Sequence, residues 1–461
     1  MTDRLDNCKG KNVKAFKNWL VLSHGFNMDG RAASLTVTDK IPYLLKEGIH
    51  LHVLSAITGI KDTRFPHQQL IAWGPAALRF DFRHWFANRF GRNIAYKIIT
   101  TLVSVILAPF MLIEKLLFGY SSQWSWAFPA YFNGLKLINE GKVNLVYSSG
   151  GAWSAHLAGL WLKKKTKLPW IVEIHDPLVI RKNEEDVGKD AQKKTDARKR
   201  YWLEREICQY ADIVWWFTDN ALYYAEKRNP NLGKTGYAKG LVITPGAKPP
   251  DIEKIKKLAK YKIGKNINIC HFGSLADDRS LSQIMRVLPQ FFQEFPSARS
   301  EIKFHVYGAS LDKKTKKNVI NNNFQDMVVS HGRLETDNNL TGRQKIAIEM
   351  MKADVLLLLH GDATWCEEYI PSKVYDYFWI NKPIWGIVYR NEKLKEMLLE
   401  RKNLVSDAEN YESILKKLIF IWKIWKKREL QNSIFMPITP ETGVNKIMDA
   451  VKKIEKKNTI K

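Results

Sequence analysis

The stretch from Val143 to Asp176 reads VNLVYSSGGAWSAHLAGLWLKKKTKLPWIVEIHD, and it decides the fold class. It begins with an apolar run, passes through a loop of small residues (SSGGA), and continues into a helical stretch that ends in a lysine cluster. A second apolar run, WIVEI, follows Pro169. Strand, loop, helix and strand in this order predict two parallel strands joined by a crossover helix. The stretch therefore indicates an α/β domain whose sheet is covered on both faces.

The same alternation recurs on both sides of this stretch. Residues 19–56 read as strand, glycine-containing loop, helix and strand, with Gly48 as the helix stop. A second alternating series follows a lysine-rich, irregular segment. We therefore predict an α/β protein with two doubly wound, Rossmann-like domains that face a central cleft. The expected boundaries are 1–245 for the N-terminal domain, 246–265 for the linker, 266–435 for the C-terminal domain and 436–461 for a helix that packs back on the N-terminal domain.

The composition is strongly basic. The 461 residues carry a formal net charge of +26, with 73 Lys and Arg against 47 Asp and Glu. Such a surface favours nucleic acid, anionic lipid head groups or phosphorylated small molecules as partners, and a solvated lysine-rich surface is the alternative. The four cysteines lie far apart and form no CxxC pair, which favours a reducing compartment over a disulfide framework or a zinc site. Because the polar N-terminus shows no secretory signal, we expect a cytoplasmic protein.

The loops after the strands are the candidate sites, because ligands of doubly wound sheets bind where the strands end. In the N-terminal half, the loop SHGFNMDGRAAS carries Gly30 and Arg31 ahead of a helix, whose free N–H groups suit an anion. His175 and Asp176 follow another strand, where His175 could orient a hydroxyl group or accept a proton. Plain turn chemistry and a structural hydrogen-bonding corner are the alternatives for these two loops.

Two loops of the C-terminal half have comparable positions. HFGSLADDRS follows a strand and places Gly273 and Ser274 before Arg279, which opens a helix. A guanidinium beside free helix N–H groups suits a diphosphate, and a surface arginine at a helix start is the alternative. The loop HGRL, residues 331–334, could lay its backbone against a planar base.

The stretch EEYIPSKVYDYFWINKPIWG, residues 367–386, follows the apolar run ADVLLLLHG. It places Glu368 in a loop and Asp376 eight positions later in a helix, with Lys373 at the helix start, where it can meet a phosphate. For each acid taken alone, a solvated position is the alternative. The combination, after a buried strand and before NKP, is more specific than any one residue in it.

The layout and these segments resemble the GT-B glycosyltransferases, especially the large group called family 4. That family carries an acid, seven further residues and a second acid at a helix start, followed by Gly-x-Pro. Glu368 and Asp376 match the two acids, and NKP at 381–383 matches the Gly-x-Pro. Arg279 and Ser274 fall where the family grips a diphosphate. The run IPSKVYDY is most similar to the branch of bacterial surface-polysaccharide enzymes.

The resemblance implies a retaining, metal-independent hexosyltransferase that moves a sugar from a nucleotide-sugar to a glycan acceptor. It implies that Glu368 meets the transferred sugar and that Asp376, where the family usually has Glu, holds the ribose. Catalysis would rest on positioning and on charge stabilisation of the leaving group, without a cofactor. The expected catalytic residues are Glu368, His175 and Asp176. The expected donor-binding residues are Gly30, Arg31, Gly273, Ser274, Arg279, Gly332, Arg333, Leu334, Ser372, Lys373, Val374 and Asp376.

Residues 75–132 form an expected insertion in the N-terminal domain. Arginines alternate with aromatic residues over 79–90, and the apolar run IITTLVSVILAPFMLI follows at 98–113, interrupted by Pro109. This run is shorter than the roughly 20 residues that span a bilayer as a helix. We therefore expect the insertion to dip into an anionic inner leaflet without crossing it, and a buried helical hairpin packed on the sheet is the alternative.

Together these features predict a peripheral enzyme on the cytoplasmic face of the inner membrane. The expected partners are a nucleotide-sugar, the anionic membrane surface, and a lipid-linked or saccharide acceptor for O-antigen, capsule or lipopolysaccharide. No nucleic-acid partner is expected, because no RNA- or DNA-binding motif accompanies the charge. The main alternative is a catalytically silent GT-B scaffold in a polysaccharide assembly complex, and an epimerase or a phosphorylase is another.

Overall fold

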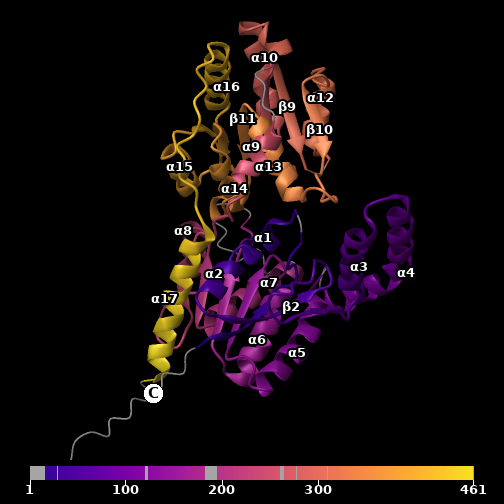
Figure 1. Ribbon diagram of the computed structural model, residues 1–461, viewed down its shortest axis with the longest axis vertical. Coiled ribbons are helices and arrows are strands. Elements are labelled where there is room, and N and C mark those ends of the chain that lie inside the picture. Colours follow the sequence, from indigo (N-terminus) through magenta and orange to yellow (C-terminus); the bar gives the residue numbers. More distant parts are fainter. Residues whose placement is uncertain are drawn as a thin grey trace, which may run out of the picture.

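The computed structural model shows two α/β domains joined end to end, with a helical hairpin beside the N-terminal domain (Figure 1). The polar N-terminus, with Cys8, lies outside the described residues, and Cys208, Cys270 and Cys366 are buried free thiols. The structure describes residues 16–28, 30–119, 123–181, 195–259, 264–276, 278–308 and 310–459.

The N-terminal domain is built on a seven-stranded parallel sheet. Its strands are β1 (Asn18–Leu22), β2 (His50–Ala56), β3 (His67–Leu70), β4 (Leu145–Gly150), β5 (Trp170–Ile174), β6 (Ile213–Trp216) and β7 (Lys239–Val242). They lie in the order β3-β2-β1-β4-β5-β6-β7. In the central register, Trp19 of β1 lies beside Leu51 of β2 and Leu145 of β4. Strands that are apolar on both faces need helices on both faces.

Helices supply that cover. They are α1 (Ala32–Thr38), α2 (Ile41–Lys46), α5 (Ala127–Asn139), α6 (Ser154–Thr166), α7 (Thr195–Tyr210), α8 (Asp219–Arg228) and the distant α17 (Pro440–Thr459), with the short 3₁₀ helix η1 (Trp124–Trp126) before α5. One core, containing Leu20 and Trp170, lies between the sheet and α5–α8. The other core, containing Trp19, lies beneath α1, α2 and α17.

The C-terminal domain contains a six-stranded parallel sheet in the order β10-β9-β8-β11-β12-β13. These strands are β8 (Ile267–Phe272), β9 (Ile302–Tyr307), β10 (Val328–Gly332), β11 (Val355–Leu359), β12 (Ile384–Val388) and β13 (Leu404–Asp407). The accompanying helices are α9 (Ile252–Leu258), α10 (Ser282–Glu294), α11 (Ala298–Glu301), α12 (Lys313–Asn321), α13 (Gly342–Lys352), η3 (Thr364–Glu368), α14 (Lys373–Ile380), α15 (Glu392–Leu399) and α16 (Tyr411–Lys426). This domain, too, has one apolar core on each side of its sheet.

The chain crosses between the domains twice. The first crossing precedes α9, and the second joins α16 to α17, which returns to the N-terminal domain (Figure 1). The two crossings touch where the backbone N–H of Ala247 donates to the carbonyl of Ile438 at 3.0 Å. In α17, Val444, Ile447 and Val451 are buried in the core that contains β1. Apolar burial therefore fastens the last helix of the chain to the first domain.

The helical hairpin consists of α3 (Pro75–Phe90) and α4 (Ile94–Phe118), which pack against each other at one side of the N-terminal domain (Figure 1). Asn93 caps α4 by accepting a hydrogen bond from the Tyr96 N–H, and Gly119 ends it in the left-handed conformation. The expectation that Pro109 interrupts this segment is wrong, because α4 runs through Pro109 as one helix. Its missing N–H costs one hydrogen bond on an exposed stretch and leaves the other helical bonds in place.

The hairpin is not buried on the sheet. Only 6% of the most apolar 18-residue window of α4 is buried, and the helix is long and apolar enough, by length and composition, to cross a membrane. The side chains of α4 that face α3 include Thr100 and Glu114, which are buried. The outward side is an apolar face, which comprises Ile94, Ile98, Leu102, Val105, Ile106, Phe110, Leu112, Ile113, Leu116 and Leu117.

Candidate functional site

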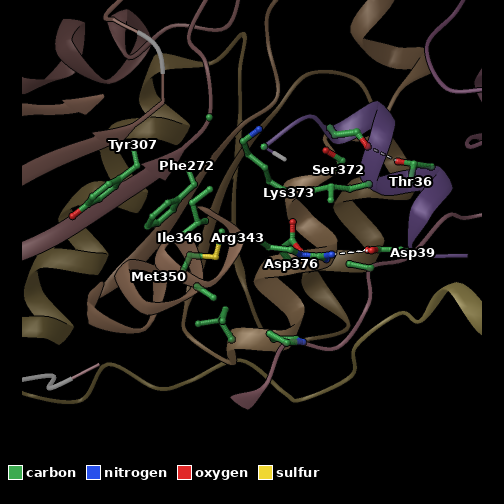
Figure 2. A pocket seen from close by; sticks show the side chains of 18 of the residues that line it. Thr36, Asp39, Phe272, Tyr307, Arg343, Ile346, Met350, Ser372, Lys373 and Asp376 are labelled. Carbon is green, nitrogen blue, oxygen red and sulfur yellow. Dashed lines mark hydrogen bonds and ion pairs between the residues drawn. The ribbon is translucent and has the colours of Figure 1, made fainter. Parts of the chain in front are cut away.

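A pocket lies between the two domains where strands of both sheets end (Figure 2). Its cavity volume is about 140 Å³. The N-terminal domain contributes the loop before α1 and the helix itself, and the linker contributes Gly246 and Ala247. The C-terminal domain contributes the ends of β8 and β9, the inner face of α13 and the start of α14. The pocket therefore has the position that doubly wound sheets give their ligands.

Aromatic rings form one wall of the pocket. Phe272 at the end of β8 stacks on Tyr307 at the end of β9, with ring centroids 4.8 Å apart and planes within 6°. His331 of β10 stacks on the other side of Tyr307 at 4.2 Å. Such a stack supplies a flat, apolar surface, with the polar group of Tyr307 at its rim. Figure 2 shows Phe272 and Tyr307 across the pocket from Asp39.

Lys373 is one of two cationic side chains that line the pocket, and Arg343 is the other. It is the first residue of α14, and its side chain lies so close to Gly273 that a Cβ there would fall 1.9 Å from the Lys373 Cε. Gly273 also has a φ of +137°, so a side chain at this position is excluded twice. Burial, with the nearby charge of Arg279, lowers the pKa of Lys373 to about 8. Within the described residues, neither Lys373 nor Arg279 forms an ion pair.

Arg343 bridges the two domains at the floor of this pocket. Its Nη1 lies 2.9 Å from Asp39 Oδ1, and its Nη2 lies 2.9 Å from Asp376 Oδ1 (Figure 2). Arg343 stands near the start of α13, where Thr341 and Gln344 form a capping box. Burial raises the pKa of Asp376, against the opposing charge of Arg343. Asp376 is thus already bound to a guanidinium in this arrangement.

Glu368 lies in a different, fully enclosed contact between the domains. Arg181 donates through Nε to Glu368 Oε1 at 2.6 Å and through Nη2 to Glu367 Oε2 at 2.9 Å. The side chains of Arg181 and Glu368 are both 0% exposed. Thr218, the N-cap of α8, donates to the carbonyl of Glu368 at 2.7 Å. Burial raises the pKa of Glu368 to about 7, although the hydrogen bond from Arg181 opposes the shift.

His175 belongs to a buried network beneath the ends of β4 and β5. Glu173 lies 2.5 Å from Lys40 Nζ and accepts a hydrogen bond from Ser149 Oγ at 2.7 Å. Ser149 also contacts His175 Nε2 at 3.1 Å, and Tyr147 donates to Glu173. Burial acts to raise the pKa of Glu173, but the charge of Lys40 and the contact with His175 outweigh this effect and hold the pKa below its usual range. Since Ser149 donates to Glu173, its oxygen accepts from His175 Nε2–H, which leaves His175 Nδ1 as an acceptor.

His175 and Asp176 line a second cavity of about 250 Å³ in the N-terminal domain. The Nδ1 atom of His175 is buried and has no hydrogen-bond partner. Gly150, Gly151 and Trp153 line the same cavity. The arrangement provides an aromatic surface and hydrogen-bonding groups side by side, which is the chemistry that a polar, ring-shaped ligand needs.

Comparisons with known proteins bear on the fold. No protein-family model matches the chain, and no curated protein sequence matches it. Among solved structures, the N-terminal domain of Candida albicans trehalose-6-phosphate phosphatase matches with a TM-score of 0.57, at 9% identity, over 95% of this chain and 97% of that one. An α,α-trehalose-phosphate synthase (UDP-forming) from Burkholderia vietnamiensis matches with a TM-score of 0.55, at 9% identity, over 95% and 96%. Anabaena HepE in complex with UDP matches with a TM-score of 0.50, at 11% identity, over 96% and 100%.

The chain has the GT-B fold. Two parallel sheets flanked by helices, with a pocket between them, form this architecture, and the fold class predicted from the sequence is confirmed. At sequence identities of 9% to 11%, these similarities support the fold alone. The family 4 resemblance remains a prediction.

The expected site residues occupy several parts of the GT-B cleft. The residues that line the pocket between the domains are Gly30, Gly273, Ser372, Lys373 and Asp376. Val374 is buried in the apolar core beside α14. Ser274 and Arg279 follow β8, Gly332 ends β10, and Arg333 and Leu334 follow it; these five do not line the pocket.

Two expected residues have surroundings that their motifs did not indicate. Arg31 is directed to α3, where its Nη2 lies 3.0 Å from His84 Nε2. Glu368 is held by Arg181, as described above.

Sequence reasoning missed Asp39, Tyr307 and Arg343 as pocket residues. The position of Tyr307 at the end of an apolar strand was a usable signal, because that end of a parallel sheet faces the ligand. No local pattern marks Asp39 or Arg343. Among the residues that the structure describes, no group of three or more His, Cys, Asp or Glu is placed to hold a metal ion.

The pKa of Lys373 predicts how ligand binding depends on pH. An anion in the pocket favours the charged lysine, so the affinity for a nucleoside diphosphate, the ligand expected from the sequence, should be constant below about pH 8 and fall by up to about tenfold per pH unit above it. Calorimetric titration of a nucleoside diphosphate from about pH 6.5 to about pH 9.5 measures this. Lys373→Met should bind it weakly, with a flat profile, and the exposed Lys393→Met should match the wild type. A flat wild-type profile would contradict the assignment.

The pKa of Glu368 predicts a pH dependence of stability. Its folded value of about 7 lies above the ordinary 4.5, so its contribution is fully present below about pH 4.5 and is lost as the pH rises through 7. Between about pH 5 and about pH 8, the wild type should lose about 3 kcal/mol of unfolding free energy relative to Glu368→Gln. Urea unfolding at both pH values checks this, with Glu367→Gln as the control. Parallel behaviour of wild type and Glu368→Gln would refute it.

Proposed function

We propose that the protein is a glycosyltransferase that moves a sugar from a nucleotide-sugar to a lipid-linked saccharide acceptor at a membrane surface. The observation that carries the proposal is the half-buried Lys373, which lines the pocket between the two GT-B domains, lies near Arg279 and has no carboxylate ion pair in the described chain. Two neighbouring like charges that are partly shielded from water repel each other, and an anion beside them would offset that repulsion.

Two features of this pocket support a nucleoside diphosphate as its ligand. Its diphosphate would be neutralised by Lys373, Arg279 and the N-terminus of α14. Its base would lie against the Phe272–Tyr307 stack. The HepE structure of the same fold contains UDP, which supports a uridine nucleotide as the first ligand to test. Stabilising the departing diphosphate is the main catalytic requirement of sugar transfer from such a donor.

The remaining roles follow from the family resemblance. We assign the donor ribose to Asp376, which would share its carboxylate between the ribose hydroxyls and Arg343. We assign Glu368 to the transferred sugar, which requires this carboxylate to leave Arg181. His175, with its free Nδ1 acceptor, and Asp176 would meet the sugar or the acceptor from the N-terminal domain.

The membrane part of the proposal rests on α4. Its outward face is apolar along the whole helix, and Lys97 and Lys115 are exposed near its two ends. A helix with an exposed apolar face and flanking cations suits the boundary between acyl chains and anionic head groups. We therefore propose that the enzyme works on the cytoplasmic face of a membrane and elongates a lipid-linked glycan for a cell-surface polysaccharide.

A transfer assay tests the function directly. The purified protein is incubated with radiolabelled UDP-sugars and GDP-sugars, each with a bacterial lipid extract, and label in the organic phase is counted. We expect transfer from one donor class, and we expect Lys373→Met to lower it at least a hundredfold, since loss of one preorganised charge typically costs about 10²–10³ in rate. Lys393→Met should retain full activity.

A binding result without transfer has a different meaning. If UDP or GDP raises the melting temperature but no sugar reaches any lipid or saccharide, the protein is a nucleotide-binding scaffold of GT-B fold. If neither nucleotide binds, the pocket assignment itself is wrong.

The apolar face of α4 predicts membrane attachment. Leu102, Ile106 and Phe110 lie on one stripe of it, and each is 57% exposed. Changing all three to Gln should release the protein from liposomes, because each side chain contributes about 1.5–3 kcal/mol when it leaves water. The melting temperature should stay unchanged. Vesicle co-sedimentation measures the effect.

The matched control replaces three apolar side chains that are exposed elsewhere. Leu258, Ile320 and Leu399 lie on other helices, and their exposed fractions are 45%, 63% and 55%. Changing these three to Gln should leave vesicle binding intact. If both triple variants lost vesicle binding equally, or if neither lost it, α4 would not be the membrane-binding element.

A further inference from the structure

Three arginines from separate parts of the chain come together beside the hairpin. Arg31 precedes α1, Arg92 lies in the turn between α3 and α4, and Arg333 follows β10 of the other domain. Arg92 Nε lies 3.0 Å from Glu335 Oε1, so the hairpin turn touches the loop that carries Arg333. We call Arg31, Arg92 and Arg333 the arginine cluster. It lies where the hairpin, the N-terminal domain and the C-terminal domain meet.

One face of α3 holds this arrangement in place. Asp81 is buried and lies 3.0 Å from His24, which follows β1. One turn later, His84 contacts Arg31. One further turn on, Asn88 donates to the carbonyl of Thr58 at 2.7 Å. Positions three and four apart share a helix face, so α3 is fixed to the N-terminal domain along its length and Arg31 is fixed with it.

Arg31 keeps its charge in this contact. Burial lowers the pKa of His84 to about 4, so its ring is neutral at physiological pH. His84 Nδ1 lies 2.9 Å from the Phe80 carbonyl, which accepts a hydrogen bond from Nδ1–H. Nε2 is then the acceptor for the Arg31 guanidinium. The partner that orients Arg31 therefore neutralises none of its charge.

The cluster has an excess of positive charge. Burial, followed by the neighbouring charges of Arg333 and Arg92, lowers the pKa of Arg31. In the part of the chain that the structure describes, Glu335 is the carboxylate paired with a member of the cluster, and neither Arg31 nor Arg333 has an acidic partner. The Arg92–Glu335 and Arg31–His84 contacts hold these like charges beside one another, and an anion between them would stabilise the arrangement.

The apolar face of α4 begins two residues after Arg92, at Ile94, whose side chain is 75% exposed. A ligand that neutralises the cluster and also covers this face must carry an anionic group at the end of a hydrocarbon chain. The donor is not such a ligand, and its diphosphate has Lys373 and Arg279. Arg31 does not line the donor pocket, although its neighbour Gly30 does.

We propose that the arginine cluster binds the phosphate group of a lipid whose hydrocarbon chain lies along the apolar face of α4. Guanidinium groups suit a phosphate because each can donate two parallel hydrogen bonds. Identifying this lipid with the acceptor rests on the proposed function, whereas the phosphate site itself does not. The site would place the polar end of the lipid beside Gly30, at the entrance of the donor pocket.

Vesicle binding tests the site without requiring catalysis. Three liposomes are compared: phosphatidylcholine alone, phosphatidylcholine with a polyprenyl phosphate, and phosphatidylcholine with phosphatidylglycerol at the same surface charge. Arg31→Gln and Arg333→Gln are measured against Arg89→Gln, an exposed arginine of α3 outside the cluster. UDP affinity is measured in solution for each variant. Because the side chain of Arg333 is exposed, we expect Arg333→Gln to fold normally.

We expect both cluster variants to bind polyprenyl phosphate vesicles on the order of tenfold to a hundredfold more weakly, as for loss of a charged hydrogen bond. On phosphatidylglycerol vesicles the affinity of both cluster variants should fall only about fivefold, which is the same loss that we expect for Arg89→Gln. Arg31 and Arg333 do not line the pocket between the domains, so UDP affinity should be unchanged, in contrast to the donor-binding role that the sequence predicts for both. Inorganic phosphate should not displace the protein from the polyprenyl phosphate vesicles.

Other outcomes overturn the proposal in distinct ways. Equal losses for all three variants on both charged vesicles would mean diffuse attraction to anionic lipid. Loss of UDP affinity with vesicle binding intact would assign the arginines to the donor, and displacement by inorganic phosphate would assign the site to free phosphate. Failure of the proposed function leaves this result standing, because none of these measurements depends on sugar transfer.

Discussion

The guanidinium of Arg343 holds carboxylates from two domains together, and the geometry of the cleft depends on it. Asp39 comes from the end of α1, and Asp376 from α14. Asp39 also accepts a hydrogen bond from the Lys248 N–H at 2.9 Å, so the linker is fixed at the same point. The side chains of Arg343 and Asp376 are 24% and 32% exposed, so removing one partner should cost less than the about 3–5 kcal/mol of a fully buried ion pair. This bridge therefore sets the distance between the aromatic wall and the N-terminal domain.

The bridge also connects ligand binding with domain position. A hydroxyl group that hydrogen-bonds to Asp376 competes with Arg343 for the same carboxylate. If Arg343 loses part of its contact with Asp376, the attraction between the two domains changes when a ligand binds in the pocket. Ligand binding and domain position would therefore be coupled through Arg343.

Much of the fold could be predicted from the sequence, because parallel strands buried on both faces are continuous apolar runs. The places of Lys373 and Gly273 in the pocket could also be predicted, because Gly273 directly follows a strand and Lys373 begins a helix. The Arg343–Asp39 contact was not, because these residues are 304 positions apart and neither belongs to a motif. The spacing of Glu368 and Asp376 gives their separation along the chain, but it does not indicate in which direction each side chain points. The 3₁₀ turn η3 buries Glu368 against Arg181 and away from the residues that line the pocket with Asp376.

The hairpin shows the limit of counting apolar residues. The apolar run of the sequence spans 98–113, whereas α4 extends from Ile94 to Phe118. The caps Asn93 and Gly119 are the better signals of its length, because they satisfy the helix ends chemically. Whether such a helix is core or surface depends on what covers it, and that depends on α3. Asp81, His84 and Asn88 of α3 contact the N-terminal domain. Arg79 and Phe86 of α3 contact Ser104 and Tyr96 of α4, which leaves the outer face of α4 uncovered.

Gly30 and Arg31 lie between the pocket and the helical hairpin, next to each other in the chain. Gly30 lines the pocket between the domains, and the next side chain is directed to the hairpin. Two anions bound on either side of this loop would repel each other. Fixed positive charge on both sides offsets that repulsion, through Lys373 and Arg279 for one anion and through the arginine cluster for the other. A strongly basic chain is therefore what a cleft needs if it is to hold a charged donor and a charged lipid at once.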